Sequence, residues 1–480
     1  MAKTEIRFGT DGWRAVIAED YTFDNVRACA QGYAEELKAS GSPDQGVVIG
    51  WDTRFGSDRF AAAVAEVLAA NGIPCLLSDR AVPTPGASYS VMARKAAGGI
   101  VITASHNPGD YNGFKVKSAA GGSASPEAVT EIEGRIEGVL AGKSDVKRIP
   151  LQKAESDGLV ERFDPIGPYL EQLRGFVDVE RIRSFGMNIA VDSMYGAGGG
   201  LFSRLLEGGN ASITEINGEP NPAFPGIGQP EPVEANLERL SKLVSESHAD
   251  VGLAFDGDAD RLGLIDENGV YISTLKGFSS IAHHMLERRG ERGAIVSTIT
   301  MSSMVDRLGE HYGVETPRTA VGFKFVGPKM SEVNALIGGE ESGGYAFRGH
   351  VPERDGLLSG LLFLEAMVVS GKRPSELLTE LEEITGPHEF NRLDLHFDEA
   401  RRDEIKNVMA TAEPGELGGL PTHSTDRQDG VKFFLGKDGA EAWGIVRLSG
   451  TEPLVRIYSE APDDGRVDAV ISDLRGMLGI

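Results

Sequence analysis

One local pattern constrains the fold of this chain most, and it occurs three times. It is an apolar strand followed by a short helix and a second strand, and it begins at GVVIGWD (46–52), NIAVDSMYGAGG (188–199) and GAIVSTI (293–299). Helix-like stretches follow at 60–72, 201–209 and 304–313, and return strands at 73–77, 212–216 and 314–319. Strands joined through a helix at this spacing lie parallel in one sheet. The pattern therefore predicts three similar α/β domains with largely parallel or mixed sheets.

The tail from about residue 388 has a different pattern, with short strands such as KFFL, AWGIVRL and VRIYSE and few helices between them. It predicts a C-terminal α+β domain. Polar stretches without periodicity, and the turn after Asp266, mark the boundaries between domains. We expect α/β domains I, II and III over 1–150, 160–266 and 267–384, and the α+β domain IV over 388–480.

Charge and composition exclude several classes of protein. The net charge of −24 provides no broad positive surface for nucleic acid or an anionic membrane, although a local basic pocket can still bind an anionic substrate. Cys29 and Cys75 stand in no zinc-like or paired spacing, and no long uninterrupted apolar stretch indicates a membrane span. We expect a cytoplasmic protein without nucleic-acid or membrane partners.

A first candidate loop lies in GGIVITASHNPGDYNGFKVK (98–117), where an apolar strand leads into a turn at Ser105. A serine in this position can act as a nucleophile or carry a phosphoryl group, and His106 and Lys115 lie close to it in the sequence. Ser, Asn and Pro also favour turns for purely local reasons, so a capped turn without chemistry is the competing interpretation.

A second candidate loop, FDGDADRLGLID (255–266), places Asp256, Asp258 and Asp260 at alternate positions between two strands. Closely spaced carboxylates suit a hard cation such as Mg²⁺ or Ca²⁺. A calcium-binding EF-hand does not fit, because Arg261 stands where that loop needs glycine and the flanks are strand-like. A solvated acidic turn is the competing interpretation.

Two further loops offer polar groups to a ligand. The segment GGEESGGYAFRGHVPERDG (338–356) presents Glu340 and Ser342 between glycines, which suits the binding of sugar hydroxyls. A flexible acidic loop without a ligand is the competing interpretation of this segment. WGIVRLSGTEPLVRIYSE (443–460) places Arg447 and Arg456 around a Ser-Gly-Thr turn, which suits phosphate, and two solvated arginines are the alternative. Arg14 ends the tight turn FGTDGWR (8–14), and Lys324 is expected in a short loop ahead of a helix.

These loops, TASHNP, DGDADR, GEESGG and RLSGTEP, occur in an order that resembles the α-D-phosphohexomutase family of phosphoglucomutases and phosphomannomutases. The resemblance spans nearly the whole chain. It implies four domains around a central cleft, each contributing one loop. It also implies a reversible transfer between hexose 1-phosphate and hexose 6-phosphate, through a phosphoserine enzyme and a hexose 1,6-bisphosphate that serves as activator.

The resemblance also implies roles for individual residues. Ser105 carries the phosphoryl group, and the three aspartates with a phosphoserine oxygen at Ser105 bind one Mg²⁺ per active site. Arg14, Lys115 and His106 are catalytic candidates, with Lys115 a plausible base only if nearby cations lower its pKa. The expected substrate-binding residues are Arg261, Lys324, Glu340, Ser342, Arg354, Arg447, Ser449, Gly450, Thr451 and Arg456.

Glucose is the expected sugar, because DYNGFK and GFKF resemble glucose-type enzymes more than the phosphoglucosamine branch. Phosphomannomutase activity is the alternative. Arg354 stands where phosphoglucomutases often carry lysine, and GGYAF follows GEES where some relatives place a histidine.

Two other functions remain open: a non-catalytic sugar-phosphate-binding protein, and a metal-dependent phosphatase that loses the phosphoryl group to water. The partner is a small hexose phosphate, and the protein is expected to be a monomer or homodimer.

Overall fold

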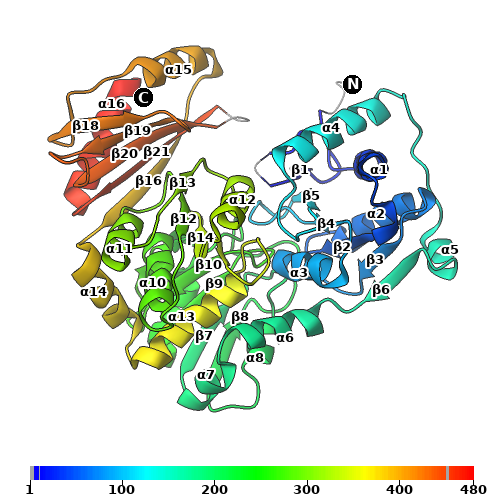
Figure 1. Ribbon diagram of the computed structural model, residues 1–480, viewed down its shortest axis with the longest axis horizontal. Helices are drawn as coiled ribbons and strands as arrows, with labels where there is room; N and C mark the ends of the chain where they lie inside the picture. Colours follow the sequence, from blue (N-terminus) through cyan, green and yellow to red (C-terminus); the bar gives the residue numbers. More distant parts are fainter. Residues whose placement is uncertain (1–4, 10, 450–452) are drawn as a thin grey trace. The chain divides into compact units, whose positions relative to one another are not determined.

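The computed structural model describes residues 5–9, 11–449 and 453–480 (Figure 1). The chain divides into two compact units. Unit 1 comprises residues 1–296 and 322–377, and unit 2 comprises residues 297–321 and 378–480. The predicted limits of the four domains and the predicted central cleft stay predictions.

The first sheet of unit 1 is mixed and has six strands in the order β1-β5-β4-β2-β3-β6. Neighbours β4, β2, β3 and β6 run parallel, while β1 and β5 are antiparallel to their neighbours. In chain order the strands are β1 (Trp13–Val16), β2 (Val47–Trp51), β3 (Cys75–Ser78), β4 (Gly98–Ile102), β5 (Tyr111–Lys117) and β6 (Val160–Phe163).

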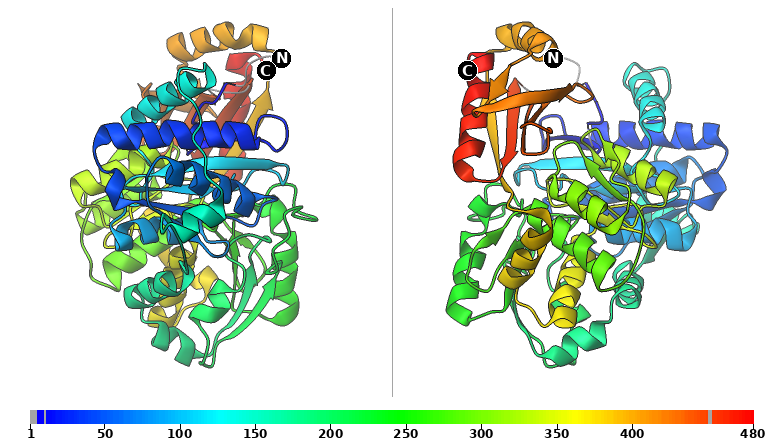
Figure 2. Two further views of the ribbon diagram at one scale, coloured as in Figure 1. Left: turned by 90° about the vertical axis from the view of Figure 1, so that its right-hand side faces the viewer. Right: turned by 60° about the vertical axis from the view of Figure 1, so that its left-hand side comes forward.

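Helices cover both faces of this sheet, because alternate residues of its buried strands point in opposite directions. Val47 and Ile49 pack with α1, α2 and α4, whereas Val48 packs with Val91 of α3 on the other face. Helices α1 and α4 lie side by side (Figure 2). The helices are α1 (Phe23–Ser40), η1 (Pro43–Gln45), α2 (Ser57–Ala70), α3 (Thr84–Arg94), α4 (Pro126–Leu140) and α5 (Leu151–Ser156).

The second sheet has the order β11-β10-β9-β7-β8, with β8, β7 and β9 parallel and β10 and β11 antiparallel. Its strands are β7 (Asn188–Asp192), β8 (Ser212–Ile216), β9 (Val251–Phe255), β10 (Leu262–Ile265) and β11 (Tyr271–Ile272). The helices are α6 (Ile166–Phe176), α7 (Val179–Phe185), α8 (Leu201–Leu205), η2 (Glu234–Asn236) and α9 (Glu238–Ser247). The hairpin between β9 and β10 carries the aspartate loop.

The third sheet has the order β13-β12-β14-β15, and the boundary between the two units passes through β12. Its strands are β12 (Ile295–Thr298), β13 (Arg318–Thr319), β14 (Ile337–Gly339) and β15 (Tyr345–Phe347). The helices are α10 (Thr274–Glu287), α11 (Met304–Tyr312), α12 (Phe323–Val333), α13 (Gly356–Ser370) and α14 (Pro374–Thr385). Helix α13 is apolar on nearly all sides and is buried almost throughout.

The predicted loop around Lys324 is wrong, because Lys324 lies in the first turn of α12. Pro328 is the sixth residue of this helix, and Val326 and Met330 anchor the helix in a hydrophobic cluster.

Unit 2 contains a purely antiparallel sheet in the order β16-β21-β20-β19-β18-β17. Its strands are β16 (Glu389–His396), β17 (Glu416–Leu417), β18 (Leu420–Asp426), β19 (Val431–Leu435), β20 (Ala442–Leu448) and β21 (Leu454–Ala461). The helices are η3 (Glu399–Arg401), α15 (Arg402–Thr411) and α16 (Asp464–Leu478), and α16 packs on the sheet. The α+β character predicted for the tail is confirmed.

The three predicted strand–helix–strand units are confirmed as well. Strands β2 and β3, β7 and β8, and β12 and β13 form parallel pairs, each pair connected through a helix. Within the described residues, no helix is long and apolar enough to cross a membrane.

Candidate active site

Ser105 lies in the loop between β4 and β5, and its side chain is fully buried. Its backbone is left-handed, with φ of 53°, and its amide donates to Thr103 Oγ1 at 2.9 Å. The Ser105 hydroxyl donates to Asp256 Oδ2 at 3.0 Å. The fold therefore brings the predicted phosphoryl-carrying serine of domain I against the predicted metal loop of domain II.

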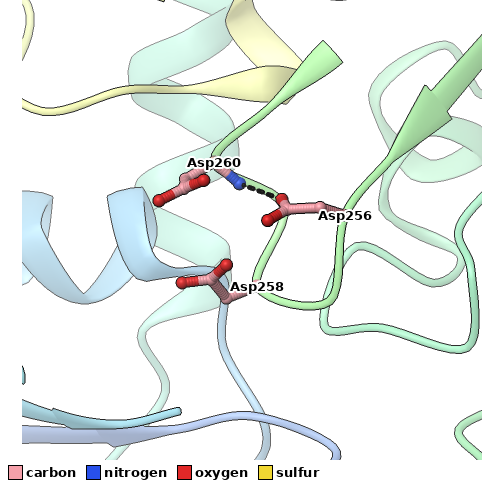
Figure 3. A group of neighbouring side chains, drawn as sticks. All are labelled: Asp256, Asp258 and Asp260. Carbon is pink, nitrogen blue, oxygen red and sulfur yellow. Dashed lines mark hydrogen bonds between the residues drawn. The ribbon is translucent and has the colours of Figure 1, made fainter. Parts of the chain in front are cut away.

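The metal loop connects β9 to β10 and holds the carboxylates of Asp256, Asp258 and Asp260, all of which are fully buried (Figure 3). One oxygen of each lies within 4.8 Å of the others. Asp256 Oδ1 accepts from the amides of Asp260 at 2.9 Å and Arg261 at 3.2 Å, which ties the loop back on its own first carboxylate. A tight loop of this kind brings the three carboxylates together, as their spacing in the sequence predicts.

The donor set fits a hard divalent cation. Asp258 Oδ1 and Asp260 Oδ1 accept no hydrogen bond from the described residues, although both are buried. Buried carboxylate oxygens without a partner are costly, and a divalent cation supplies the missing charge. Burial and repulsion from Asp260 and Asp258 raise the pKa of Asp256 well above its ordinary value, which reflects the same excess of negative charge.

Lys115, on β5, points its ammonium at these carboxylates. Its Nζ lies 2.8 Å from Asp258 Oδ2, 3.6 Å from Asp260 Oδ2 and 2.7 Å from Asp11 Oδ2. Burial lowers the pKa of Lys115, but the three carboxylates raise it by more, so its pKa lies above the ordinary value. The condition set for Lys115 as a base, a pKa lowered by nearby cations, is therefore not met by these protein groups, because carboxylates surround its ammonium.

The other predicted residues of this region surround the serine. His106 Nδ1 lies 3.5 Å from Ser105 Oγ, and burial together with Arg261 and Arg14 lowers the pKa of His106, so that its ring is neutral near pH 7. Arg14 donates to Asn107 Oδ1 at 2.6 Å, on the same loop. Arg261 pairs with Glu231 at 2.6 Å.

The third predicted loop turns between β14 and β15 and carries Glu340 and Ser342. Burial raises the pKa of Glu340 to about 7, even though the Arg354 guanidinium opposes this from 3.7 Å. Arg354 also contacts Asp260 at 2.8 Å and Asp11 at 2.7 Å, so it links this loop to the metal loop. Lys324 reaches the carbonyl of Gly9 at 3.4 Å.

The predicted phosphate loop belongs to unit 2. Arg447 on β20 stands directly opposite Arg456 on β21 in the antiparallel register. Like charges in opposed positions repel, and each has an acidic partner: Asp429 at 2.9 Å from Arg447 and Asp394 at 3.5 Å from Arg456. An anion lying against this face of the two strands would be attracted to both arginines. Ser449 begins the turn, while Gly450 and Thr451 lie outside the described residues.

Sequence reasoning missed several buried groups that complete the site. Asp11 forms ion pairs with both Lys115 and Arg354, and Thr84 donates to Asp258 Oδ2 at 2.6 Å. Arg54 donates to the main-chain carbonyl of Ser105. One signal was available for Arg54, since it follows the carboxyl end of a buried parallel strand, where α/β folds place their functional groups. Nothing local distinguished Thr84, at the start of a helix.

Comparisons with known proteins cover most of the chain. Four models of the phosphoglucomutase/phosphomannomutase family match: alpha/beta/alpha domains I, II and III at residues 5–141, 167–269 and 278–384, and the C-terminal domain at 398–477. A phosphoglucomutase/phosphomannomutase of Thermococcus kodakarensis is 34% identical over 95% of both chains. A probable phosphoglucosamine mutase of Methanosphaera stadtmanae is 30% identical over 96% of both chains.

A solved structure, a putative phosphomannomutase from Thermus thermophilus, superposes with a TM-score of 0.86. It is 34% identical and covers 100% of both chains. The two curated relatives thus match nearly the whole chain and the solved structure shares its fold, but the three names refer to different sugars.

Proposed function

We propose, from the premise that this chain belongs to the phosphoglucomutase/phosphomannomutase family, that it interconverts glucose 1-phosphate and glucose 6-phosphate through a phosphoserine at Ser105. The family makes it a phosphohexomutase-type intramolecular phosphotransferase of hexose phosphates. The choice of glucose, the metal and the residue roles are our proposal.

One observation carries the proposal: the Ser105 hydroxyl lies 3.0 Å from a buried carboxylate of a three-aspartate cluster. A protein that only binds sugar phosphates needs no serine hydroxyl at a cation site, whereas transfer through a phosphoserine needs the hydroxyl and the cation site together. Asp256, Asp258 and Asp260 are the proposed ligands of one Mg²⁺, with an oxygen of phosphorylated Ser105 beside them. The bound cation would neutralise charge on the phosphoryl group during transfer.

The protein's own residues then bind, orient and balance charge. Ser105 gives its phosphoryl group to the free hydroxyl of the hexose monophosphate, and after the bisphosphate turns around it receives the other phosphoryl group. Arg14 and Arg261 supply positive charge near the serine, and Lys115 balances the aspartates. Neutral His106 lies within reach of the serine oxygen. These groups allow two anionic phosphates to meet in a protein whose net charge is −24.

Substrate recognition is proposed for the two remaining loops. Glu340 and Ser342 read the sugar hydroxyls in both orientations, and Lys324 and Arg354 are further residues that contact the substrate. For unit 2 we propose that Arg447 and Arg456, together with Ser449, Gly450 and Thr451, bind the phosphate that is not being transferred.

Glucose is preferred because DYNGFK and GFKF resemble glucose-type enzymes. The relatives' names include mannose and glucosamine, so these sugars are the direct competitors. The deciding assay compares kcat/KM for the 1-phosphates of glucose, mannose and glucosamine under one set of conditions. A higher value for mannose or glucosamine would replace glucose in the proposal.

The test of the phosphoserine is intact-protein mass before and after incubation with glucose 1,6-bisphosphate and Mg²⁺. The wild type should gain one phosphoryl group and Ser105→Ala none. No adduct on the wild type under any condition would favour the binding-protein alternative. Release of inorganic phosphate as fast as isomerisation would instead favour the metal-dependent phosphatase.

A further inference from the structure

Arg54 lies in the turn between β2 and α2, and its side chain is enclosed, with 3% of the residue exposed. Its guanidinium donates to four main-chain carbonyls, three in the loop that carries the serine and the fourth at the first residue of β5, which follows that loop. The acceptors are the carbonyls of Ser105 at 2.6 Å, Asn107 at 2.5 Å, Pro108 at 2.6 Å and Tyr111 at 3.0 Å. One side chain thus holds three carbonyls of this loop and the start of the strand that follows it.

Asp52 fixes the remaining edge of the guanidinium. Its Oδ2 lies 3.2 Å from Arg54 Nε, and its Oδ1 accepts from the Arg54 amide at 3.0 Å and from Ser57 Oγ at 2.7 Å. The ring of Phe224 covers the face of the guanidinium, with its centroid 5.0 Å from the guanidinium carbon. The ion pair with Asp52 and the ring of Phe224 restrict the plane of the group, and this orients its four donated hydrogen bonds.

The serine loop needs such support because Ser105 adopts a left-handed backbone that a non-glycine residue rarely occupies. Gly257 of the metal loop approaches it so closely that a Cβ there would lie 2.4 Å from the Ser105 carbonyl oxygen. That same carbonyl receives a hydrogen bond from Arg54. The position of the serine oxygen relative to the aspartates therefore depends on how this carbonyl is held.

We propose that Arg54 is a positioning residue for phosphoryl transfer: its fixed fork holds the backbone of the serine loop so that Ser105 Oγ stays aligned on the metal loop. This inference rests on the proposed function, since it concerns the geometry of the phosphoserine. Two phosphates repel each other during each turnover, and a loop held by fewer hydrogen bonds yields to that repulsion. Arg54 acts through four main-chain carbonyls and needs no contact with the substrate.

The back of Arg54 and Asp52 borders a cavity of about 560 Å³, which is also lined by Trp51, Arg80 and Arg204. Removing the Arg54 side chain would connect its place with this cavity. A small guanidinium compound then has both a route and a site with the same acceptors, which makes chemical rescue a direct test.

The experiment compares wild type, Arg54→Lys, Arg54→Ala with and without ethylguanidinium, and Arg80→Ala as the control. Arg80 lines the same cavity but is half-exposed and pairs with Asp79. We expect Arg54→Lys, which keeps the charge but not the fork, to lower kcat by about 100-fold with KM unchanged. Ethylguanidinium should raise kcat of Arg54→Ala but not of Arg54→Lys, and Arg80→Ala should match wild type.

Wild-type kcat in Arg54→Lys would overturn the proposal. So would a loss in Arg54→Ala that ethylguanidinium fails to restore, or a loss in both variants that follows their thermal unfolding at the assay temperature. The mass gain of the wild type with glucose 1,6-bisphosphate reports the proposed function separately. If the wild type gains no phosphoryl group, the proposed function fails; if it does and Arg54→Lys is fully active, only the positioning role fails.

Discussion

Breaking the buried ion pair between Lys117 and Glu353 should destabilise unit 1 far more than breaking an exposed pair of similar length. Lys117 Nζ lies 2.5 Å from Glu353 Oε2, and both side chains are fully buried. At that distance the attraction is roughly 7 kcal/mol for an effective dielectric constant of about 20, before the cost of desolvating both ions. The pair joins β5 to the segment that precedes α13.

Lys117→Met leaves the Glu353 carboxylate buried. Removal of one partner of such a pair costs about 3–5 kcal/mol. Arg354 remains near the carboxylate, with Nε at 3.3 Å and its amide at 2.9 Å, so we expect the low end, about 3 kcal/mol. Glu353→Gln should cost less, because Asp11 at 3.6 Å still faces the ammonium. The double variant should be more stable than the sum of the single losses predicts, by about 1–3 kcal/mol.

The assay is urea unfolding followed by tryptophan fluorescence, since Trp13 and Trp51 lie in the first sheet. Lys329→Met is the control: Lys329 lies 2.6 Å from Glu332, but the two side chains are 31% and 66% exposed. We expect it to cost less than about 1 kcal/mol. Equal losses in Lys117→Met and Lys329→Met, or additive losses in the double variant, would refute the role of burial in this argument.

Three further outcomes are expected. Burial raises the pKa of Glu340 from 4.5 to about 7, so the stability from its bound proton is complete below about pH 4.5 and is lost as pH rises through 7. Relative to Glu340→Gln, wild type should therefore lose about 3 kcal/mol of unfolding free energy between about pH 4 and pH 8. A difference between the two proteins that does not depend on pH would contradict this. Mg²⁺ at about 100 times its Kd should stabilise wild type against thermal unfolding by about 2.7 kcal/mol, and should stabilise Asp258→Asn by much less. Equal stabilisation of the two proteins would mean that the ion binds elsewhere. Gly257→Ala should lower kcat by about 100-fold, because the added Cβ would lie 2.4 Å from the Ser105 carbonyl oxygen. The control is Gly134→Ala in α4, where an added Cβ meets no atom within 4 Å; it should be active and more stable by about 0.5–1 kcal/mol. Full activity of Gly257→Ala would show that the two loops move apart freely.

Periodicity in the sequence was sufficient for the fold class. Apolar runs such as VVIGW and NIAVD, each followed by a helix and a return strand, predict parallel strand pairs, and the three repeats led to three sheets that contain such pairs. The alternating strands after residue 388 led to the antiparallel sheet of unit 2. Lys324 lies in the first turn of α12 and not in a loop ahead of a helix, because Phe323, Val326 and Met330 of α12 are buried in one hydrophobic cluster and hold that turn in the helix.

The candidate site divides in the same way. The sequence by itself determined the local loops: the three aspartates converge because they alternate in one tight turn, and Arg447 faces Arg456 because few residues separate two strands that pair antiparallel. Only the tertiary structure decided which loops meet. Asp11, Lys115 and Arg354 are far apart in the chain, and their charges became one network only when three segments packed together. The condition set for Lys115 as a base is not met, because the carboxylates that the fold places around its ammonium raise its pKa by more than burial lowers it, and no local pattern records those carboxylates.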